Sequence, residues 1–586
     1  MYNKSMPNTI PQQFFQTAQK YPKRQALKYK KDDTWMAMSF LEVENQVKDF
    51  ASGLKHLGCK KGDRVAILSH NRPWWVVADL AIMSVGAVVV TVHTTFSPKL
   101  TAHVLRDSRS KFLVVSDQEQ LTKVLLYQKE LPDLQKIIYI DLAKPMNDIV
   151  DIRQLSFDEV LELGRRNKQS AVSSKLASDK LSEDDIASII YTSGTTGNPN
   201  GVILTHKNFL SNSISATKAV PIFSKDTFLS FLPLSHILER TGGYYAPFVV
   251  TGACMAFAQS PKTLIDDLKA VKPTMLISVP RIFERFHKSV WDKVKAGSDF
   301  KRKLFINALK QQKGTWQYKI FDILVFKKIR GALGGRFRMT ISGGSSLNPK
   351  LGKFFDKVGI IIIEGYGMTE TSPIIAVNRE GKIKYGTVGQ AIEGVEIKIA
   401  DDKEILVKSP GIMKGYTSLD REVIDQDGWF HTGDLGFLDN EGYLTIIGRK
   451  KEMMVLQTGK NIWPEKIEQV LNTDRFISQT VIIGHDKQYV TVLIVPDWSE
   501  VKNYRKEKNL SSKSPDNLIT DSDMIKLYEE RLECYKENFG EWELPKKFAL
   551  LTDELSQENE ELTPTLKLRR KTIEKNYSKE IGGMYA

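Results

Sequence analysis

The stretch from Ile189 to His206, IIYTSGTTGNPNGVILTH, decides the fold prediction for this chain. Its two ends are rich in β-branched residues and predict two strands, whereas its middle is a loop dense in glycine, threonine and serine. Gly194, Gly197 and Gly201 allow backbone N–H groups to point at one centre, so the loop can wrap a polyphosphate. The side-chain donors of this loop are Thr192, Ser193, Thr195 and Thr196.

The loop lacks the signatures of the best-known nucleotide sites. The GK[ST] of a Walker A loop is absent from the whole chain, and so is GxGxxG, which disfavours P-loop and dinucleotide-binding chemistry. Taken alone, a loop of this composition is more often an ordinary surface loop. Its assignment therefore depends on other motifs.

Buried strands are predicted on both sides of this unit. Apolar runs rich in β-branched residues alternate with helical or loop stretches, which is typical of an α/β fold with mostly parallel strands. The runs are Val65 to Leu68, Phe112 to Val115, Ile137 to Ile140, Met275 to Ser278 and Ile360 to Ile363.

The length and a change in composition predict two domains. A chain of 586 residues exceeds the size at which one hydrophobic core stops growing. The pattern changes near Gly448, so we predict a large, multi-subdomain α/β domain over 1–448 and a smaller α+β domain over 449–586. In the smaller domain, Pro464 opens a predicted helix. The predicted strands of the smaller domain are Thr480 to Ile483 and Tyr489 to Val495. Two polar stretches are predicted as exposed connections, Ser170 to Asp185 and Asn509 to Asp523.

The composition excludes several classes of protein. Cys59, Cys254 and Cys534 lie far apart, so neither a disulfide framework nor a cysteine zinc site is encoded. The apolar stretch from Trp74 to Val92 contains Asp79, and β-branched residues fill only its second half. We interpret it as a buried helix followed by a buried strand instead of a membrane span.

The net charge of +14 favours anionic partners. Nucleic acid is not expected, because zinc-finger, RNP and heptad signatures are absent. The N-terminus does not read as a secretory signal, so we expect a cytoplasmic protein. We also expect peripheral contact with an anionic membrane surface, such as the inner surface of a cell membrane, through the basic tail. The alternative is a basic tail that is simply solvated. That tail contains Arg569, Arg570 and Lys571.

The glycine-rich loop resembles the signature phosphate loop of the AMP-forming acyl-adenylate superfamily, which includes acyl-CoA synthetases, luciferases and peptide-synthetase adenylation domains. Five further segments resemble that superfamily's other motifs, in its order. They are Ser342 to Leu347 (SGGSSL), Glu364 to Glu370 (EGYGMTE), Trp429 to Asp434 (WFHTGD), Gly448 to Glu452 (GRKKE) and Leu562 to Arg570 (LTPTLKLRR).

This resemblance implies a nucleotide site and its Mg²⁺ ion. It implies that the Tyr366 ring stacks on adenine, that Asp434 accepts from both ribose hydroxyls, and that Arg449 adds a ribose or phosphate contact. Glu370 and Thr192 are the implied magnesium ligands, and one carboxylate suffices for a hard cation that bridges phosphates. Further ATP- or AMP-binding residues implied are Ser193, Gly194, Thr195, Thr196, Gly197, Gly343, Gly344, Glu364, Gly365, Gly367 and Thr369.

The resemblance also implies a mobile smaller domain with two catalytic segments. Lys567 would reach the substrate carboxylate and the α-phosphate. Gly459 and Lys460 belong to a loop that would serve thioester formation, and the domain would rotate about a hinge at Lys451. Two positions depart from the superfamily: Asn200 stands where many members have lysine, and Leu566 where many have glycine.

Within the superfamily, three segments look most like long-chain fatty acid CoA ligases. The resemblance places His236 beside the acyl carboxylate as a fourth catalytic residue with Lys567, Glu370 and Thr192. It implies formation of acyl-AMP from a fatty acid and ATP, followed by transfer to coenzyme A. The alternatives are transfer to a carrier protein, or a non-catalytic nucleotide- or lipid-binding protein. Whether the chain forms a homodimer stays open. The candidate walls of an acyl tunnel are Gly242, Gly243, Tyr244 and Tyr245. The three segments are Phe231 to Arg240, Val279 to Glu284 and Glu541 to Phe548.

Overall fold

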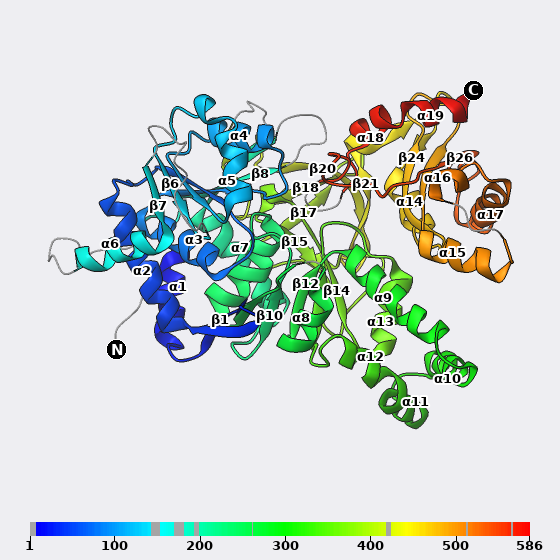
Figure 1. Ribbon diagram of the computed structural model, residues 1–586, viewed down its shortest axis with the longest axis horizontal. Coiled ribbons are helices and arrows are strands. Elements are labelled where there is room, and N and C mark those ends of the chain that lie inside the picture. The colour runs from blue at the N-terminus through cyan, green and yellow to red at the C-terminus, as the bar shows by residue number, and fades with distance from the viewer. Residues whose placement is uncertain are drawn as a thin grey trace.

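The computed structural model describes a large α/β domain with a smaller domain at one end (Figure 1). This confirms the predicted fold class. The described residues are 7–141, 153–168, 181–192, 199–260, 262–417, 423–510, 514–563 and 567–586.

The first large sheet has eight strands and carries the phosphate loop. From β8 to β7 its neighbouring strands are parallel, as the buried apolar runs predict, whereas β9 returns antiparallel to β8. In spatial order the strands are β19 (Gly415–Tyr416), β9 (Asn200–Thr205), β8 (Ile186–Thr192), β4 (Val88–Val92), β3 (Arg64–Leu68), β5 (Phe112–Val115), β6 (Lys136–Tyr139) and β7 (Arg153–Ser156).

The second large sheet has nine strands, and its centre is also parallel. In order they are β16 (Gln390–Ala391), β15 (Ile374–Val377), β14 (Ile362–Gly367), β13 (Met339–Ser342), β12 (Met275–Ser278), β10 (Thr227–Ser230), β11 (Cys254–Phe257), β1 (Gln25–Lys31) and β2 (Thr34–Ser39). The strand predicted at Ile360 starts two residues later and runs through Gly367.

One hydrophobic core joins the two large sheets. It contains Val89 of β4, Trp75 of α3, Phe209 of α7, Phe248 of η3 and Met255 of β11, all fully buried. Helices of this part include α1 (Ile10–Lys20), α2 (Phe40–His56), α3 (Pro73–Val85), α4 (Pro98–Asp107), α5 (Gln118–Leu125), η1 (Gln128–Glu130), α6 (Phe157–Lys168), α7 (His206–Ala219), the π-helix η3 (Glu239–Thr251), α8 (Leu264–Val271), α9 (Pro280–Lys295) and α13 (Pro349–Val358).

The stretch from Trp74 to Val92 folds as predicted. Helix α3 ends at Gly86, whose φ of 84° is the left-handed conformation that glycine adopts without a Cβ clash, and β4 follows. Buried Asp79 hydrogen-bonds to Arg240 and Tyr245 of η3, so the charge that interrupts the stretch is paired. Among the described residues, no helix is long and apolar enough to cross a membrane. Cys59, Cys254 and Cys534 are free, as expected.

The smaller domain follows a four-stranded antiparallel sheet and contains the predicted helix and strands. The four strands are β17 (Glu396–Ile399), β18 (Glu404–Lys408), β20 (Phe430–Leu438) and β21 (Leu444–Arg449). The smaller domain contains η6 (Lys450–Glu452), β22 (Met454–Val455), β23 (Asn461–Ile462), α14 (Pro464–Leu471), β24 (Ile477–Ile483), β25 (Thr491–Pro496), α15 (Trp498–Glu507), α16 (Pro515–Leu518), α17 (Ser522–Glu533), η7 (Lys536–Asn538), β26 (Lys547–Leu550), α18 (Arg570–Asn576) and α19 (Ser578–Tyr585).

Two details of this domain correct or extend the sequence prediction. The stretch from Asn509 to Asp523 is not simply an exposed loop, because α16 lies within it and Leu518 packs in the domain core. Contacts with the large domain run between α9 and α15, where Lys288 pairs with Asp497 and Lys295 lies 3.2 Å from Glu500. The boundary predicted after Gly448 stays a prediction.

Candidate active site

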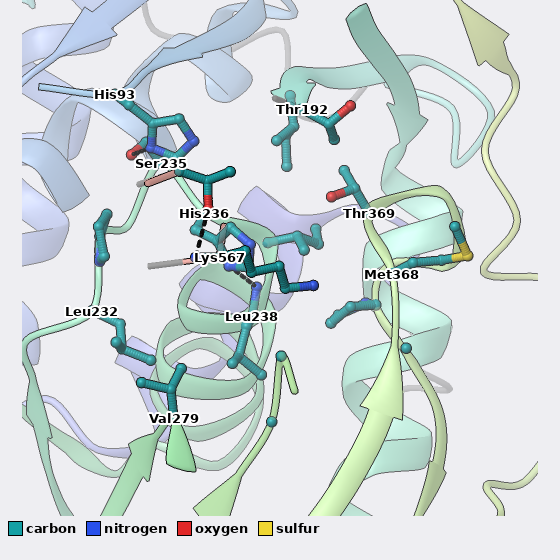
Figure 2. A pocket seen from close by; sticks show the side chains of 18 of the residues that line it. His93, Thr192, Leu232, Ser235, His236, Leu238, Val279, Met368, Thr369 and Lys567 are labelled. Carbon is teal, nitrogen blue, oxygen red and sulfur yellow. Dashed lines mark hydrogen bonds between the residues drawn. The ribbon is translucent and has the colours of Figure 1, made fainter. Parts of the chain in front are cut away.

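A cavity of about 1320 Å³ lies where the two large sheets, the four-stranded sheet and the smaller domain meet. Figure 2 shows part of this cavity from close by. Thr192 and Thr369 lie on one side, His93, Ser235 and His236 lie on the other, and Lys567 lies between them. Most residues that the motifs single out line this one cavity.

The phosphate loop lies at one wall of the cavity. Thr192 ends β8 and Asn200 begins β9, and both line the cavity. The Thr192 hydroxyl donates to the Asn200 carbonyl at 3.5 Å. The strand–loop–strand prediction is therefore confirmed at both ends. Five loop residues with predicted phosphate contacts lie outside the described residues: Ser193, Gly194, Thr195, Thr196 and Gly197.

The predicted adenine segment is a strand. Gly365, Tyr366 and Gly367 end β14 and line the cavity, as do Gly343 and Gly344 after β13. A turn at Tyr366, the alternative to a site, does not occur. Strand geometry instead exposes one face of this segment to the ligand space.

Glu364 is placed differently from its neighbours. It is buried, is not among the residues that line the cavity, and its carboxylate accepts a hydrogen bond from the Leu347 N–H at 2.8 Å. Burial raises the pKa of this carboxyl to about 8. The nucleotide contact predicted for Glu364 stays a prediction.

The predicted ribose site is built from two paired strands. Asp434 of β20 lies opposite Arg449 of β21, and the Arg449 Nε lies 3.0 Å from a carboxylate oxygen of Asp434. The Tyr366 hydroxyl donates to the other oxygen at 2.7 Å. Because Asp434 lies beside it, the pKa of Arg449 is raised. A buried carboxylate is thus held at the cavity wall, where it can accept hydrogen bonds from hydroxyl groups.

Glu370 is positioned by a tyrosine that sequence analysis did not identify. The Tyr416 hydroxyl donates to the Glu370 carboxylate at 2.8 Å, and both residues line the cavity with Thr192 and Thr369. Over the described ranges, no group of three or more His, Cys, Asp or Glu could form a metal site from protein ligands alone. One carboxylate and a hydroxyl fit a Mg²⁺ ion that phosphate oxygens and water also coordinate.

Lys567 enters the cavity from the smaller domain (Figure 2). Its side chain keeps contact with solvent inside the open cavity, yet the surrounding protein and the Arg449 cation lower its pKa. Glu465, Asp434 and Glu452 act in the opposite direction and favour the charged amine. The structure therefore brings this predicted catalytic residue to the site. The preceding Pro564, Thr565 and Leu566 lie outside the described residues.

His236 faces Lys567 and has a second histidine beside it. The Nδ1 of His236 accepts from the Leu238 N–H at 3.3 Å, which leaves the proton of the neutral ring on Nε2. Desolvation, His93 and Lys567 lower its pKa to about 3. The buried His93 ring bonds to the Ser235 hydroxyl at 2.7 Å, and its pKa is lowered to about 4 by burial. Sequence analysis missed His93, which has no motif around it.

The predicted hinge lies at the cavity, whereas the thioester loop does not. Lys451 lies in η6 and lines the cavity. Gly459 and Lys460 lie in the turn between β22 and β23, outside the set of lining residues, and the Lys460 amine lies 4.8 Å from the Trp542 ring centre. The structure therefore holds the Lys567 segment at the site without the Gly459 loop.

Part of the cavity lining is apolar, and we call this part the apolar branch. Gly242 and Ala246 of η3 line it, whereas Tyr244 and Tyr245, also candidate walls, are buried in the core on the other side of that helix. Of the four candidate wall residues, Gly242 therefore lines the cavity, whereas Gly243, Tyr244 and Tyr245 do not. The other apolar lining residues of this part are Ala216, Val220, Ile222, Leu232, Ile277, Ile341, Ile374 and Val377.

Comparison with known proteins agrees with these motifs. A profile of the AMP-binding enzyme family matches residues 14–417, and one of the AMP-binding enzyme C-terminal domain matches 451–586. The chain is 33% identical over 574 residues to the long-chain-fatty-acid–CoA ligase FadD15 of Mycobacterium bovis. The alignment covers 94% of this chain and 93% of that protein.

Two further similarities bear on the acceptor and the fold. The chain is 28% identical over 651 residues to the chloroplastic long-chain-fatty-acid–[acyl-carrier-protein] ligase AEE15 of Arabidopsis thaliana, covering 98% of this chain and 86% of that protein. The solved structure of the anthranilate CoA ligase AuaEII in complex with anthranoyl-AMP has a TM-score of 0.75 at 21% identity and covers 98% of both chains. The latter shows a shared fold.

Proposed function

Because this chain belongs to the AMP-binding enzyme family, we propose that it activates a long-chain fatty acid with ATP and transfers the acyl group to coenzyme A. The observation that carries the proposal is one cavity that Lys567 and His236 line together with the ribose-site pair, Asp434 and Arg449, and the apolar branch. A nucleotide, a carboxylate and an acyl chain can then occupy one continuous space.

The apolar branch supports an acyl substrate on energetic grounds. Each buried methylene contributes about 0.8 kcal/mol, so a chain that adds ten methylenes to the branch gains about 8 kcal/mol before ordering costs. Lining residues such as Ile277, Ile341 and Val377 offer no charge to bind a polar substrate. A long aliphatic chain therefore suits this branch better than a small polar acid.

In the first half-reaction, the fatty acid carboxylate attacks the α-phosphorus of ATP, and pyrophosphate leaves. Asp434 would accept from the ribose hydroxyls and fix the nucleotide. The Lys567 ammonium would offset the negative charge that develops on the α-phosphate oxygens. The Nε2–H of His236 would donate to the acyl carboxylate, because its Nδ1 is already an acceptor of the Leu238 N–H.

Glu370 and Thr192 would hold Mg²⁺ at the phosphates. When bound, the ion neutralises phosphate charge and orients the leaving group. The residues present fit this part, since Tyr416 fixes the Glu370 carboxylate at the cavity wall. The contribution of the chain itself would be to place one fixed carboxylate where the triphosphate would lie.

In the second half-reaction, the coenzyme A thiol attacks the acyl carbonyl and AMP leaves. Gly459 and Lys460 would assist this step, and they lie away from the cavity when Lys567 occupies it. Both segments belong to the smaller domain, so this domain would rotate about Lys451 between the half-reactions.

A cytoplasmic location and a homodimer stay predictions from the sequence.

A panel of carboxylic acids tests the proposal. Pyrophosphate release with ATP and Mg²⁺ should be fastest with long-chain fatty acids, and Glu370→Ala should reduce it by several orders of magnitude while Lys398→Ala, at an exposed position on β17, should not. If none of the acids in the panel led to pyrophosphate release, the non-catalytic alternative would be favoured. A preference for short or aromatic acids would refute the long-chain assignment.

A carrier protein remains the second candidate acceptor, because AEE15 carries that activity in its name. Thioester formation should be measured with free coenzyme A and with a phosphopantetheine-bearing carrier protein in parallel. We expect faster turnover with coenzyme A. Turnover with the carrier protein alone would replace our proposal for the acceptor.

A further inference from the structure

A helical corner projects from the second large sheet. It consists of α10 (Asp299–Lys310), α11 (Trp316–Phe321), the π-helical segment η4 (Asp322–Phe326) and α12 (Lys327–Ala332). Figure 1 shows it at the lower right, beyond α9 and α13 and away from α4 and α5 at the upper left. None of the motifs described above falls within it.

The outer face of this corner is unusually apolar. Of fourteen large hydrophobic side chains that are strongly exposed in the described residues, six lie between Phe300 and Leu324. Phe300 is 74% exposed, Trp316 68% and Ile323 64%. The other three are Ile306, Ile320 and Leu324.

These exposed side chains are not needed to form the hydrophobic core of the corner. The inner faces of the same helices already pack: Ala308, Tyr318 and Phe326 form a buried cluster with Val358 of α13. Trp316, Ile320, Ile323 and Leu324 follow a spacing of four, three and one, which places them on one side of the continuous helical run. The corner therefore has one apolar face inside and a second one outside.

The same segment is strongly basic. Residues 299–328 contain eight lysines and arginines but only two aspartates. Both aspartates are already paired, Asp299 with Arg302 and Asp322 with Arg330. All eight cations are exposed. They are Lys301, Arg302, Lys303, Lys310, Lys313, Lys319, Lys327 and Lys328.

We propose that this basic-apolar corner, residues 299–328, docks the protein on an anionic lipid bilayer. Tryptophan, isoleucine and phenylalanine side chains can enter the boundary between headgroups and acyl chains, while neighbouring lysines reach the anionic phosphates. An acidic protein partner would satisfy the charges but leaves no reason for six exposed apolar side chains. A second copy of the corner would bring the two basic clusters together, which opposes pairing.

The choice of a lipid partner is strengthened by the proposed function, because a long-chain fatty acid partitions into bilayers. The docking geometry itself rests on the corner alone. The contact predicted for the C-terminal tail stays a prediction for Lys571, which is exposed. Arg570 of that tail is held by two hydrogen bonds to the buried carboxylate of Glu468, so it is not available to lipid.

Vesicle flotation tests the proposal with the full-length protein. Vesicles of phosphatidylcholine mixed with phosphatidylglycerol should carry the protein upward at low salt, and high salt should weaken this binding. The variant Trp316→Glu/Ile323→Glu should bind these vesicles about tenfold more weakly or worse, because two carboxylates would have to enter the interface. Lys303→Glu/Lys319→Glu should weaken binding by a similar factor and flatten the salt dependence.

Matched controls lie at the opposite end of the molecule. Leu126, at the end of α5, is 67% exposed, and Lys129 of η1 is exposed nearby. Leu126→Glu makes one apolar-to-acidic change and Lys129→Glu one basic-to-acidic change outside the corner, and both should leave flotation unchanged. Adenylation of a water-soluble short-chain acid should be unchanged in the corner variants, which separates failed docking from failed catalysis.

Three results would overturn the proposal. The first is wild-type protein that does not float with anionic vesicles at low salt. The second is equal loss of binding in the Leu126 and Trp316 variants. The third is a wild-type dimer that becomes a monomer in the Trp316→Glu/Ile323→Glu variant without any vesicle binding, which would assign the corner to a second copy of the chain.

Discussion

Gly242 should set the acyl chain length that the site accepts. It lies on η3 at the wall of the apolar branch, and a Cβ built there would lie 2.9 Å from the Cδ1 of Ile277, another wall residue. Gly242→Val adds three carbons to this wall and should displace about three substrate methylenes. At about 0.8 kcal/mol each, the loss is about 2.4 kcal/mol, or roughly 60-fold in kcat/KM. Gly242→Ala should cost a long chain about fourfold.

The assay is kcat/KM for acyl-CoA formation over a series of saturated fatty acids. We expect the loss for palmitate and little change for a chain short enough to end before Gly242. Adding Ile277→Ala to Gly242→Val should recover most of the palmitate activity, because it frees the volume that the new side chain takes. An equal loss at every chain length would refute the reasoning and assign Gly242 to the packing of η3.

Three further predictions follow from the site and the core. Lys567→Ala should abolish acyl-AMP formation but leave thioester formation from supplied acyl-AMP nearly intact. Lys451→Pro should instead spare adenylation and slow thioester formation. Equal effects on both half-reactions in each variant would end the rotating-domain proposal. Asp434→Ala should weaken ATP and AMP binding by about 1.5 to 3 kcal/mol in calorimetric titration, and unaltered affinities would contradict the ribose role. Burial lowers the pKa of His206 to about 4, below its unfolded value near 6.5, so its stabilising effect is complete above pH 6.5 and is lost as the pH falls toward 4. His206→Gln should therefore lose less stability over that window, by at most about 1.4 kcal/mol per pH unit in urea unfolding, and an identical pH slope in both proteins would refute it.

Much of the local structure could be predicted from the sequence. The strands that flank the glycine-rich loop, the helix and strand between Trp74 and Val92, and the helix that Pro464 opens were all predicted because apolar periodicity, Gly and Pro act over a few residues. The motif residues Thr192, Tyr366, Glu370, Asp434 and Lys567 were identified by resemblance, and the structure brings them to one cavity.

Only the tertiary structure decided which distant side chains meet. Asp79 pairs with Arg240 across 161 positions and His93 with Ser235 across 142, and neither partner has a local signal that names the other. Likewise, η3 turns Gly242 toward the cavity and Tyr244 into the core, a choice that depends on the sheets that pack against that helix. Backbone preferences are local, whereas burial and charge pairing depend on segments that folding brings together.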